Sequence, residues 1–341
     1  MLESTELRHD VRPALAESMP AQAIRAAFHS VATEVPANRV SSVEVAERLG
    51  ISEEWILSRT GIRERPMARP EERLSDYATR ASALALARAG VDPSELDLVL
   101  VATLTADELT PNSAPLVANA LGARRAGAFD VGSACTGFLS AVAAGAAQIE
   151  SGRARWVLVV GADFISRVIN WEDKKSAPLF GDAAGAAVLG PADGGHGVIG
   201  PIVLGADGSH GVSLVIPNVE RKIRMDGPEV YKHAVARMAE STLAALDRAR
   251  LTLDDIDLFV YHQANARITR ALGERLELEP ERVVDCIERY GNSSAGTLPV
   301  ALVEAERDGR LRPGARVVLG AFGGGFTWGS GVIEWGGTGN G

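Results

Sequence analysis

The fold is decided by a sequence pattern that occurs twice, once in each half of the chain. The first copy contains DPSELDLVLVATLT at 92–105, followed by ALGARRAGAFDVGSACTG at 120–137. The second contains TLDDIDLFVYHQAN at 252–265, followed by ALGERLELEPERVVDCIERYGNSSAG at 271–296. In both copies an acidic turn leads into an apolar strand, then a helix with Ala-Leu-Gly, a further strand and a loop of small residues. This order predicts two related units that pack together.

Apolar runs around this pattern indicate buried strands. Runs without polar alternation are typical of strands that are covered on both faces, and they lie at 96–103, 155–163, 183–190, 256–263 and 316–323. Amphipathic stretches between the runs predict helices at 73–89, 230–249 and 298–307. Strands alternating with helices place the chain in the α/β class, built in layers.

The two copies carry candidate reactive side chains in comparable positions. Cys135 and Asn292 lie in the small-residue loops of the first and second copies, and His262 ends the strand whose counterpart carries Thr103. The carboxyl ends of strands are where α/β proteins place their active sites. If the two units face each other, we expect Cys135, His262 and Asn292 to meet at a common centre.

The composition excludes several classes of protein. A hydrophobic share of 46% in 341 residues is enough for a large core. Two cysteines cannot form a disulfide framework, so we expect a reducing, cytoplasmic setting. The net charge of −9 argues against nucleic acid or an anionic membrane surface as a partner.

The expected organisation is an extension and two halves. Residues 1–23 have several acidic side chains and no continuous apolar stretch, so we interpret them as an N-terminal extension rather than a secretory signal. The two halves are expected at 24–200, with Cys135, and at 201–338, with His262 and Asn292. The uncharged segment at 131–148 is rich in Ala, Gly and Ser, which favours a central buried helix over a membrane span.

Cys135 is a candidate nucleophile because it lies between a strand and a helix. Backbone N–H groups and the positive end of a helix stabilise a thiolate, so we expect the pKa of this thiol to be lowered. A buried structural thiol is the alternative for any single cysteine. For Cys286, in the apolar run VVDCIERYG, we keep that alternative.

A Cys, His and Asn set supports two chemistries. In a thiol hydrolase the His deprotonates the Cys and the Asn orients the His. In a decarboxylating condensing enzyme the Cys carries an acyl group, while His and Asn donate hydrogen bonds to the oxygen of a developing enolate. Cys135 lacks the local signature of papain-like proteases. Taken alone, His262 is also compatible with a structural role and Asn292 with a turn or helix cap.

Six motifs together resemble one family, β-ketoacyl-acyl-carrier-protein synthase III, whose members are condensing enzymes with a thiolase-like fold of duplicated α/β/α/β/α layered halves. The resemblance runs in order from residue 24 to residue 335. The motifs are EEWILSRTGIRER at 53–65, DVGSACTGF at 130–138, LFGDAAGAAVLG at 179–190, YHQAN at 261–265, YGNSSAG at 290–296 and AFGGGFTWGS at 321–330.

The resemblance implies specific catalytic roles. Cys135 would be the acylated nucleophile, and His262 and Asn292 would promote decarboxylation of a malonyl thioester. The backbone N–H groups of Cys135 and Gly324 would form the oxyanion hole, with Phe322 beside it. A neutral imidazole and an amide suit this task, since a carboxylate in place of the amide would repel the malonyl carboxylate.

The resemblance also implies binding positions. Trp55 and Arg59 match positions that hold coenzyme A, although Trp55 also suits a core anchor. Lys174 stands where the family often has Arg, which weakens the expected stacking on adenine. The remaining matched positions line the pantetheine tunnel or bind the acyl carrier protein: Met225, Gly227, Tyr231 and Asn265 for the tunnel, and Lys232 and Arg267 for docking.

Thr110 matches a position where many relatives have Phe, which closes the acyl pocket, often across the dimer interface. The smaller Thr predicts a longer or branched primer rather than acetyl alone. The docking residues are also compatible with ordinary solvated charges.

The function we predict is a ping-pong Claisen condensation of an acyl-CoA primer with malonyl-acyl carrier protein, by a homodimer that initiates fatty-acid or polyketide synthesis. We expect no metal and no cofactor beyond the coenzyme A thioester substrate. The alternatives are a related acyltransferase of secondary metabolism that transfers without decarboxylation, a thiol hydrolase, and a non-catalytic subunit. The last of these normally lacks the nucleophile, whereas Cys135 is present.

Overall fold

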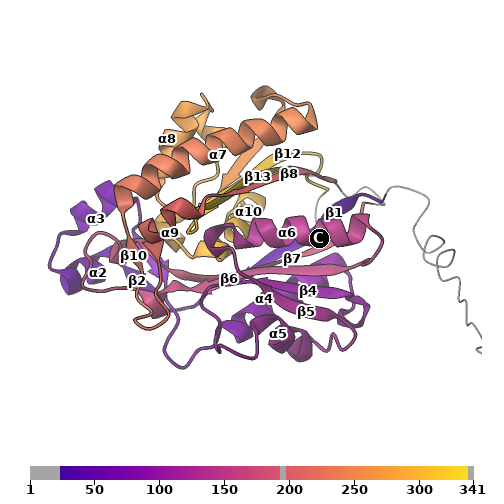
Figure 1. Cartoon of the computed structure of the whole chain (residues 1–341), viewed down its shortest axis with the longest axis horizontal. Helices are drawn as coiled ribbons and strands as arrows, with labels where there is room; N and C mark the ends of the chain where they lie inside the picture. The colour runs from indigo at the N-terminus through magenta and orange to yellow at the C-terminus, as the bar shows by residue number, and fades with distance from the viewer. Residues whose placement is uncertain (1–23, 193–196, 337–341) are drawn as a thin grey trace, which may run out of the picture.

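A computed structural model describes residues 24–192 and 197–336, so the extension predicted at 1–23 lies outside the described residues. The described chain forms five layers in the order helices, sheet, helices, sheet, helices (Figure 1). Among the described helices, none combines the length and apolar character needed to cross a bilayer.

The first sheet is built from strands of the first half. In spatial order its described strands are β1 (Ala26–Glu34), β7 (Asp182–Pro191), β6 (Val157–Phe164), β4 (Leu98–Ala102) and β5 (Gly127–Val131). Strands β4, β5 and β6 are parallel, whereas β7 runs antiparallel to both β6 and β1. Helices α4 (Leu74–Ala89) and α5 (Ser113–Leu121) cover its outer face.

The second sheet repeats this order and these directions. Its described strands, in the same spatial sense, are β8 (Ile199–Ala206), β13 (Thr327–Glu334), β12 (Arg316–Gly323) and β11 (Leu258–Tyr261). Strand β11 is parallel to β12, and β13 is antiparallel to β12 and β8. A parallel bridge between Phe259 and Val283 takes the place of β5. The shared topology supports duplication. The predicted boundary after residue 200 falls inside β8, which begins at Ile199, so the exact boundary between the halves stays a prediction.

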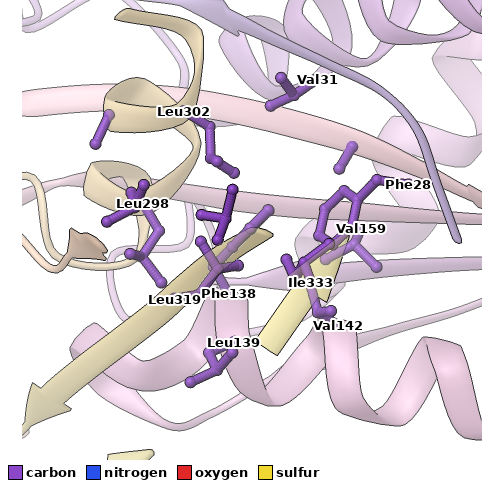
Figure 2. Close-up of a cluster of buried hydrophobic side chains, with 14 of the residues drawn as sticks. Phe28, Val31, Phe138, Leu139, Val142, Val159, Leu298, Leu302, Leu319 and Ile333 are labelled. Carbon is purple, nitrogen blue, oxygen red and sulfur yellow. The ribbon is translucent and has the colours of Figure 1, made fainter. Parts of the chain in front are cut away.

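Helices α6 (Gly137–Glu150) and α10 (Thr297–Arg307) form the middle layer between the two sheets. Figure 2 shows the core around them, where Phe138 and Leu139 of α6 lie near Leu319 of β12 and Leu298 of α10. Phe138 is fully buried, and burial of such a side chain contributes about 1.5–3 kcal/mol. The middle layer therefore joins the two halves through a common core.

The outer layer of the second half consists of α7 (Gly227–Ala249) and α8 (Ala266–Arg275). Helix α7 begins before the predicted residue 230 because Asp226 caps it, its carboxylate accepting from the Glu229 amide at 3.3 Å, and because Pro228 in the first turn suits a helix start. The same end of the molecule carries smaller elements, namely β2 (Arg39–Ser41), α2 (Ser42–Leu49), α3 (Glu53–Thr60), β3 (Glu64–Pro66), β9 (Leu214–Val215), β10 (Arg224–Met225) and α9 (Ile287–Tyr290).

The prediction of one helix over 131–148 is wrong at its start. Residue 131 ends β5, and a 3-10 turn, η2 (Ala134–Thr136), precedes α6. The turn requires Ala134 at a φ of 44°, and a helix cannot continue through that left-handed conformation. The central position of α6 is as predicted, and one face of the helix is buried, whereas Ala144, Ala147 and Glu150 are exposed.

Candidate active site

A cavity of about 1400 Å³ lies where the two halves meet, and Cys135, His262 and Asn292 all line it. Cys135 comes from the first half, and the other two side chains come from the second. The structure therefore brings the three predicted residues into one site, although they are far apart in the sequence.

Cys135 is held by a tight turn and by the opposite sheet. It sits in η2, just before α6, and is partly exposed to the cavity. Gly323, at the end of β12, packs directly against it, since a Cβ at that position would lie 2.8 Å from the Cys135 amide nitrogen. Only glycine allows β12 to approach this closely, and Gly324 continues from there along the cavity wall. The Cys135 backbone therefore adjoins Gly323, the residue before the predicted oxyanion-hole residue Gly324.

The expectation of a lowered pKa for Cys135 is wrong. Burial raises the pKa of this thiol to about 12, the Ser294 hydroxyl lowers it in part, and the charge of Asp163 raises it further. Burial also lowers the pKa of His262 to about 3. The free site therefore holds a neutral thiol and a neutral imidazole at pH 7, because desolvation disfavours both charged forms more than the helix end favours the thiolate.

His262 is fixed through its Nδ1 atom. It follows β11, and its amide donates to the Gly320 carbonyl at 2.7 Å. Its Nδ1 shares a hydrogen bond of 2.5 Å with Thr297 Oγ1, which also lies 3.0 Å from the Ser294 carbonyl oxygen. All of these groups are buried. The bond at Nδ1 sets the orientation of the ring and leaves Nε2 as the nitrogen available for chemistry.

Asn292 is oriented by its own backbone turn. Its Oδ1 accepts from the Ser294 amide at 2.9 Å. Its main chain forms a parallel β-bridge with Phe180, and the Asn292 backbone amide donates to the Leu179 carbonyl at 2.8 Å. Because the side-chain oxygen is engaged, the amide nitrogen of Asn292 is the group left to donate a hydrogen bond at the cavity wall.

Three further residues shape the site and were not predicted from sequence: Thr297, Ser294 and Asp163. Asp163 is the penultimate residue of β6 and is fully buried. Its carboxylate joins the two halves, because Oδ2 accepts from the Ala295 amide at 3.2 Å while Oδ1 binds the segment after β4. The donors to Oδ1 are Thr103 Oγ1, Leu104 N, Thr105 N and Thr105 Oγ1. A carboxylate near the end of a buried strand is the sequence signal that could have indicated it.

Ser294 opens the 3-10 turn η8 (Ser294–Gly296) before α10. Its φ is 52°, which is positive like the φ of 44° of Ala134 in the equivalent turn η2. Its hydroxyl makes no hydrogen bond of standard geometry, yet it lies close enough to lower the pKa of Cys135 and of Asp163. The two turns with positive φ place Cys135 and Asn292 in the equivalent loops that the repeat predicts.

The entrance of the cavity carries most of the predicted binding residues. Those that line it are Trp55, Arg59, Met225, Gly227, Tyr231, Asn265, Arg267, Phe322 and Gly324. The Arg59 guanidinium stacks on the Trp55 ring, 4.3 Å from its centroid. Asn265 links this region to α8, donating to the Arg59 carbonyl at 3.1 Å and capping the helix.

Three predicted positions lie outside this cavity in the described chain: Lys174, Lys232 and Thr110. The Lys174 ammonium lies near Gly50, and the neighbouring Lys175 lines the cavity instead. Lys232 and Thr110 are exposed. Cys286 is buried in the core, as expected.

The charge at this site opposes that of the whole protein. Its ionisable lining, apart from Cys135, His262 and the Tyr231 phenol, consists of the basic residues Arg59, Lys175, Arg224 and Arg267 and the acidic residue Asp226. The net charge of the chain is −9. A basic entrance on an acidic protein attracts anionic substrates locally.

These features define a class: an acyltransferase with a thiolase-like fold, in which a cysteine from one half faces a histidine and an asparagine from the other. Solved structures support the fold. The 3-oxoacyl-[acyl-carrier-protein] synthase III of Aquifex aeolicus VF5 is 37% identical, with a TM-score of 0.88 over 91% of this chain and 100% of that one. The priming β-ketosynthase of the R1128 polyketide pathway is also 37% identical, with a TM-score of 0.89 over 94% and 99%.

Family models of 3-oxoacyl-[acyl-carrier-protein] synthase III match residues 129–208 and, for its C-terminal part, residues 246–335. The β-ketoacyl-[acyl-carrier-protein] synthase III of Symbiobacterium thermophilum is 44% identical over 89% of this chain and 96% of that protein. The protein of that name from Listeria monocytogenes strain 10403S is 41% identical over 92% and 100%. The chain belongs to the β-ketoacyl-acyl-carrier-protein synthase III family and is a condensing acyltransferase.

Proposed function

We propose that this enzyme condenses an acyl-CoA primer with malonyl-acyl carrier protein and so initiates fatty-acid or polyketide synthesis. The observation that carries the proposal is the convergence of Cys135, His262 and Asn292 on one cavity with a basic entrance. A thiol can hold the primer, and two neutral donors can stabilise an enolate without adding charge. Loss of CO2 generates the carbanion, so the reaction needs no strong base.

Acylation begins with neutral groups. The Cys135 thiol proton moves to His262 Nε2 as sulfur attacks the thioester carbonyl, and the Cys135 and Gly324 N–H groups stabilise the oxyanion. The bond to the coenzyme A sulfur then breaks, and the thiol proton leaves with coenzyme A. In this step Nε2 accepts a proton, so Nδ1 carries the hydrogen and donates it to Thr297 Oγ1, while the Thr297 hydroxyl donates to the Ser294 carbonyl.

Decarboxylation needs the opposite tautomer of the same imidazole. The bond to the malonyl carboxylate breaks, CO2 leaves, and the electron pair moves to the thioester oxygen, where His262 Nε2–H and the Asn292 amide donate. Nδ1 must then accept, which the Thr297 hydroxyl permits by rotating from the Ser294 carbonyl to Nδ1. The enolate carbon attacks the acyl thioester, and the Cys135 sulfur leaves as a thiolate that takes up one proton from solvent water. Thr297 is thus a positioning residue for both half-reactions.

Substrate delivery follows from the charge at the entrance. Arg59 and Trp55 would hold coenzyme A, with Lys175 rather than Lys174 at the cavity itself. Exposed Lys232 and Arg267 would dock the acidic carrier protein. We further propose a cytoplasmic location, consistent with two unpaired thiols.

We propose a homodimer in which Thr110 reaches the acyl pocket of the partner subunit. Thr110 is exposed and lies outside the cavity of its own chain, and Leu109 beside it is 95% exposed. Phe129 on the edge strand β5 is 50% exposed. Apolar side chains in such positions favour burial against a second copy. Light scattering after size exclusion tests the dimer, and a monomer would refute it.

The test of the function uses purified protein, a series of acyl-CoA primers and labelled malonyl-acyl carrier protein, with CO2 and β-ketoacyl product followed together. We expect equal amounts of both, and Cys135→Ala should abolish acylation. Acyl transfer without CO2 would move the assignment to a non-decarboxylating acyltransferase, and free acid as the main product would indicate a hydrolase. A preference for acetyl over isobutyryl and octanoyl primers would contradict the role given to Thr110.

A further inference from the structure

Two histidines and a glutamate converge beside the cavity and take no part in the proposed reaction. They are His210 in the 3-10 turn η5 (Gly208–Ser213) and Glu229 and His233 in α7. His233 Nε2 lies 2.9 Å from Glu229 Oε1, and His210 Nδ1 lies 3.5 Å from the same oxygen. The candidate ligand atoms all lie within 4.8 Å of one another.

The cluster is partly buried and held by its surroundings. The exposed side-chain fractions are 30% for His210, 32% for Glu229 and 17% for His233. Both imidazole rings pack against the Phe326 ring, each with a centroid separation of 5.3 Å, and Phe326 itself is buried. The aromatic floor limits the motion of both rings and keeps bulk water from that side.

Backbone hydrogen bonds fix the turn η5 at both ends. Before the turn, Asp207 and Phe326 exchange two of them, with N···O distances of 2.8 and 2.7 Å. After the turn, the Asp226 amide donates to the Ser213 carbonyl at 2.8 Å, and β9 pairs with β10. On α7, Glu229 and His233 are four residues apart and therefore share one helix face. The three side chains are thus positioned by rigid elements.

The separations suit a tetrahedral transition-metal ion. Ligand atoms at about 2.0–2.1 Å from zinc are separated by about 3.3 Å in a tetrahedron, close to the 2.9 and 3.5 Å seen here. Imidazole nitrogen and carboxylate oxygen are ligands that zinc accepts. The other ring nitrogen of His210 lies 4.0 Å from the Asp207 carboxylate, which is longer than a hydrogen bond, so Asp207 contributes negative charge beside the cluster.

We propose that His210, Glu229 and His233 form a binding site for a divalent transition-metal ion of the zinc type, with water as the fourth ligand. The ion would join η5 to α7. Val212 of η5 and Val230 of α7 both line the cavity, and Phe326 packs on Phe322, which lines it too, at a centroid separation of 4.8 Å. Metal binding would therefore stiffen one wall of the cavity without taking part in the chemistry at Cys135.

The experiment is a zinc titration of the full-length, chelator-stripped protein against a chromogenic chelator, with Co2+ absorption as a probe of the ligand set. We expect one ion per chain and an increase of the melting temperature on loading, since a ligand of the folded state stabilises it. His210→Gln, Glu229→Gln and His233→Gln should each weaken zinc binding at least tenfold. Glu240→Gln, on the same helix and away from the cluster, should leave the affinity unchanged.

Zinc can also bind a catalytic thiol, so the titration is repeated on Cys135→Ala. Retention of the site in that variant, together with its loss in His233→Gln, supports the proposal. The melting temperature of each Gln variant in chelator, compared with that of the wild type, shows that the fold is intact. Absence of stoichiometric binding in the wild type, or equal affinity in the wild type and in folded His210→Gln and His233→Gln, would overturn it.

Discussion

Replacing Thr297 by Val removes the hydroxyl that contacts the imidazole while keeping nearly the same volume in a buried position. Thr297 is 2% exposed, and its oxygen lies 2.5 Å from His262 Nδ1 and 3.0 Å from the Ser294 carbonyl. The variant leaves both of these buried groups without this partner. A buried polar group that loses its partner costs about 1–3 kcal/mol, and on the transition state this corresponds to about a 5- to 150-fold loss of rate.

We expect Thr297→Val to lower kcat for condensation within that range and to change KM little, because the hydroxyl orients the imidazole and does not touch the substrate. Trapping of the labelled acyl-enzyme measures acylation, and CO2 release from malonyl-acyl carrier protein measures decarboxylation. Both should fall, since Thr297 supports a different tautomer of His262 in each.

Thr297→Ser is the matched control, because it restores the hydroxyl and removes only a methyl group. It should recover most of the activity. The reasoning is refuted if a folded Val variant keeps both rates within twofold of the wild type. If the Ser variant is as slow as the Val variant, packing of the methyl group rather than the hydroxyl is responsible.

Three other perturbations test the site. Burial raises the pKa of Cys135 to about 12 and lowers that of His262 to about 3. The rate of alkylation of the free enzyme by iodoacetamide should therefore rise about tenfold per pH unit between about pH 7 and pH 10. A plateau that begins below pH 8 would instead indicate a thiolate–imidazolium pair. Gly323→Ala places a Cβ 2.8 Å from the Cys135 amide nitrogen and should slow acylation at least tenfold. Gly273→Ala is the control, because no atom lies within 4 Å of its Cβ. Equal acylation rates in the two variants, measured by labelling, would contradict the close packing. Thr110→Phe should lower kcat/KM for octanoyl-CoA at least tenfold relative to acetyl-CoA, and an unchanged ratio would exclude this residue from the acyl pocket.

Local pattern predicted five strands closely because their signal is local, whereas β1, β8 and β13 were not among the predicted apolar runs. The run at 316–323 coincides with β12, since apolar residues covered on both faces leave a continuous hydrophobic stretch. The start of α6 was missed because an alanine gives no sign that Ala134 takes a left-handed conformation. Only the requirement that Cys135 face the opposite sheet explains that turn.

The sequence predicted the three residues that meet in the cavity, but not the residues around them or the effect of burial on them. Cys135, His262 and Asn292 follow from the repeat and the family motifs, whereas Thr297 is separated from its partner His262 by 35 residues. The pKa of Cys135 was predicted in the wrong direction, because a helix end is visible in the sequence and burial by the opposite half is not. His210 and His233 likewise come together only through the fold. Glu229 and His233 are four residues apart, a spacing that places them on one face of a helix.

The enclosure of α6 and α10 between two sheets determines which parts of the enzyme can move during turnover. Amides on the buried face of α6 and along most of α10 should exchange with deuterium only in rare openings, since packed side chains from both sheets cover them. Cys135 and Asn292 lie just before the N-terminal ends of these two helices, whereas His262 follows β11. Admission of a primer and release of coenzyme A then depend on motion of α3 and of the loop at 216–223, which line the cavity outside this layer. The exchange rates of these segments should respond to substrate, while those of the middle layer should not.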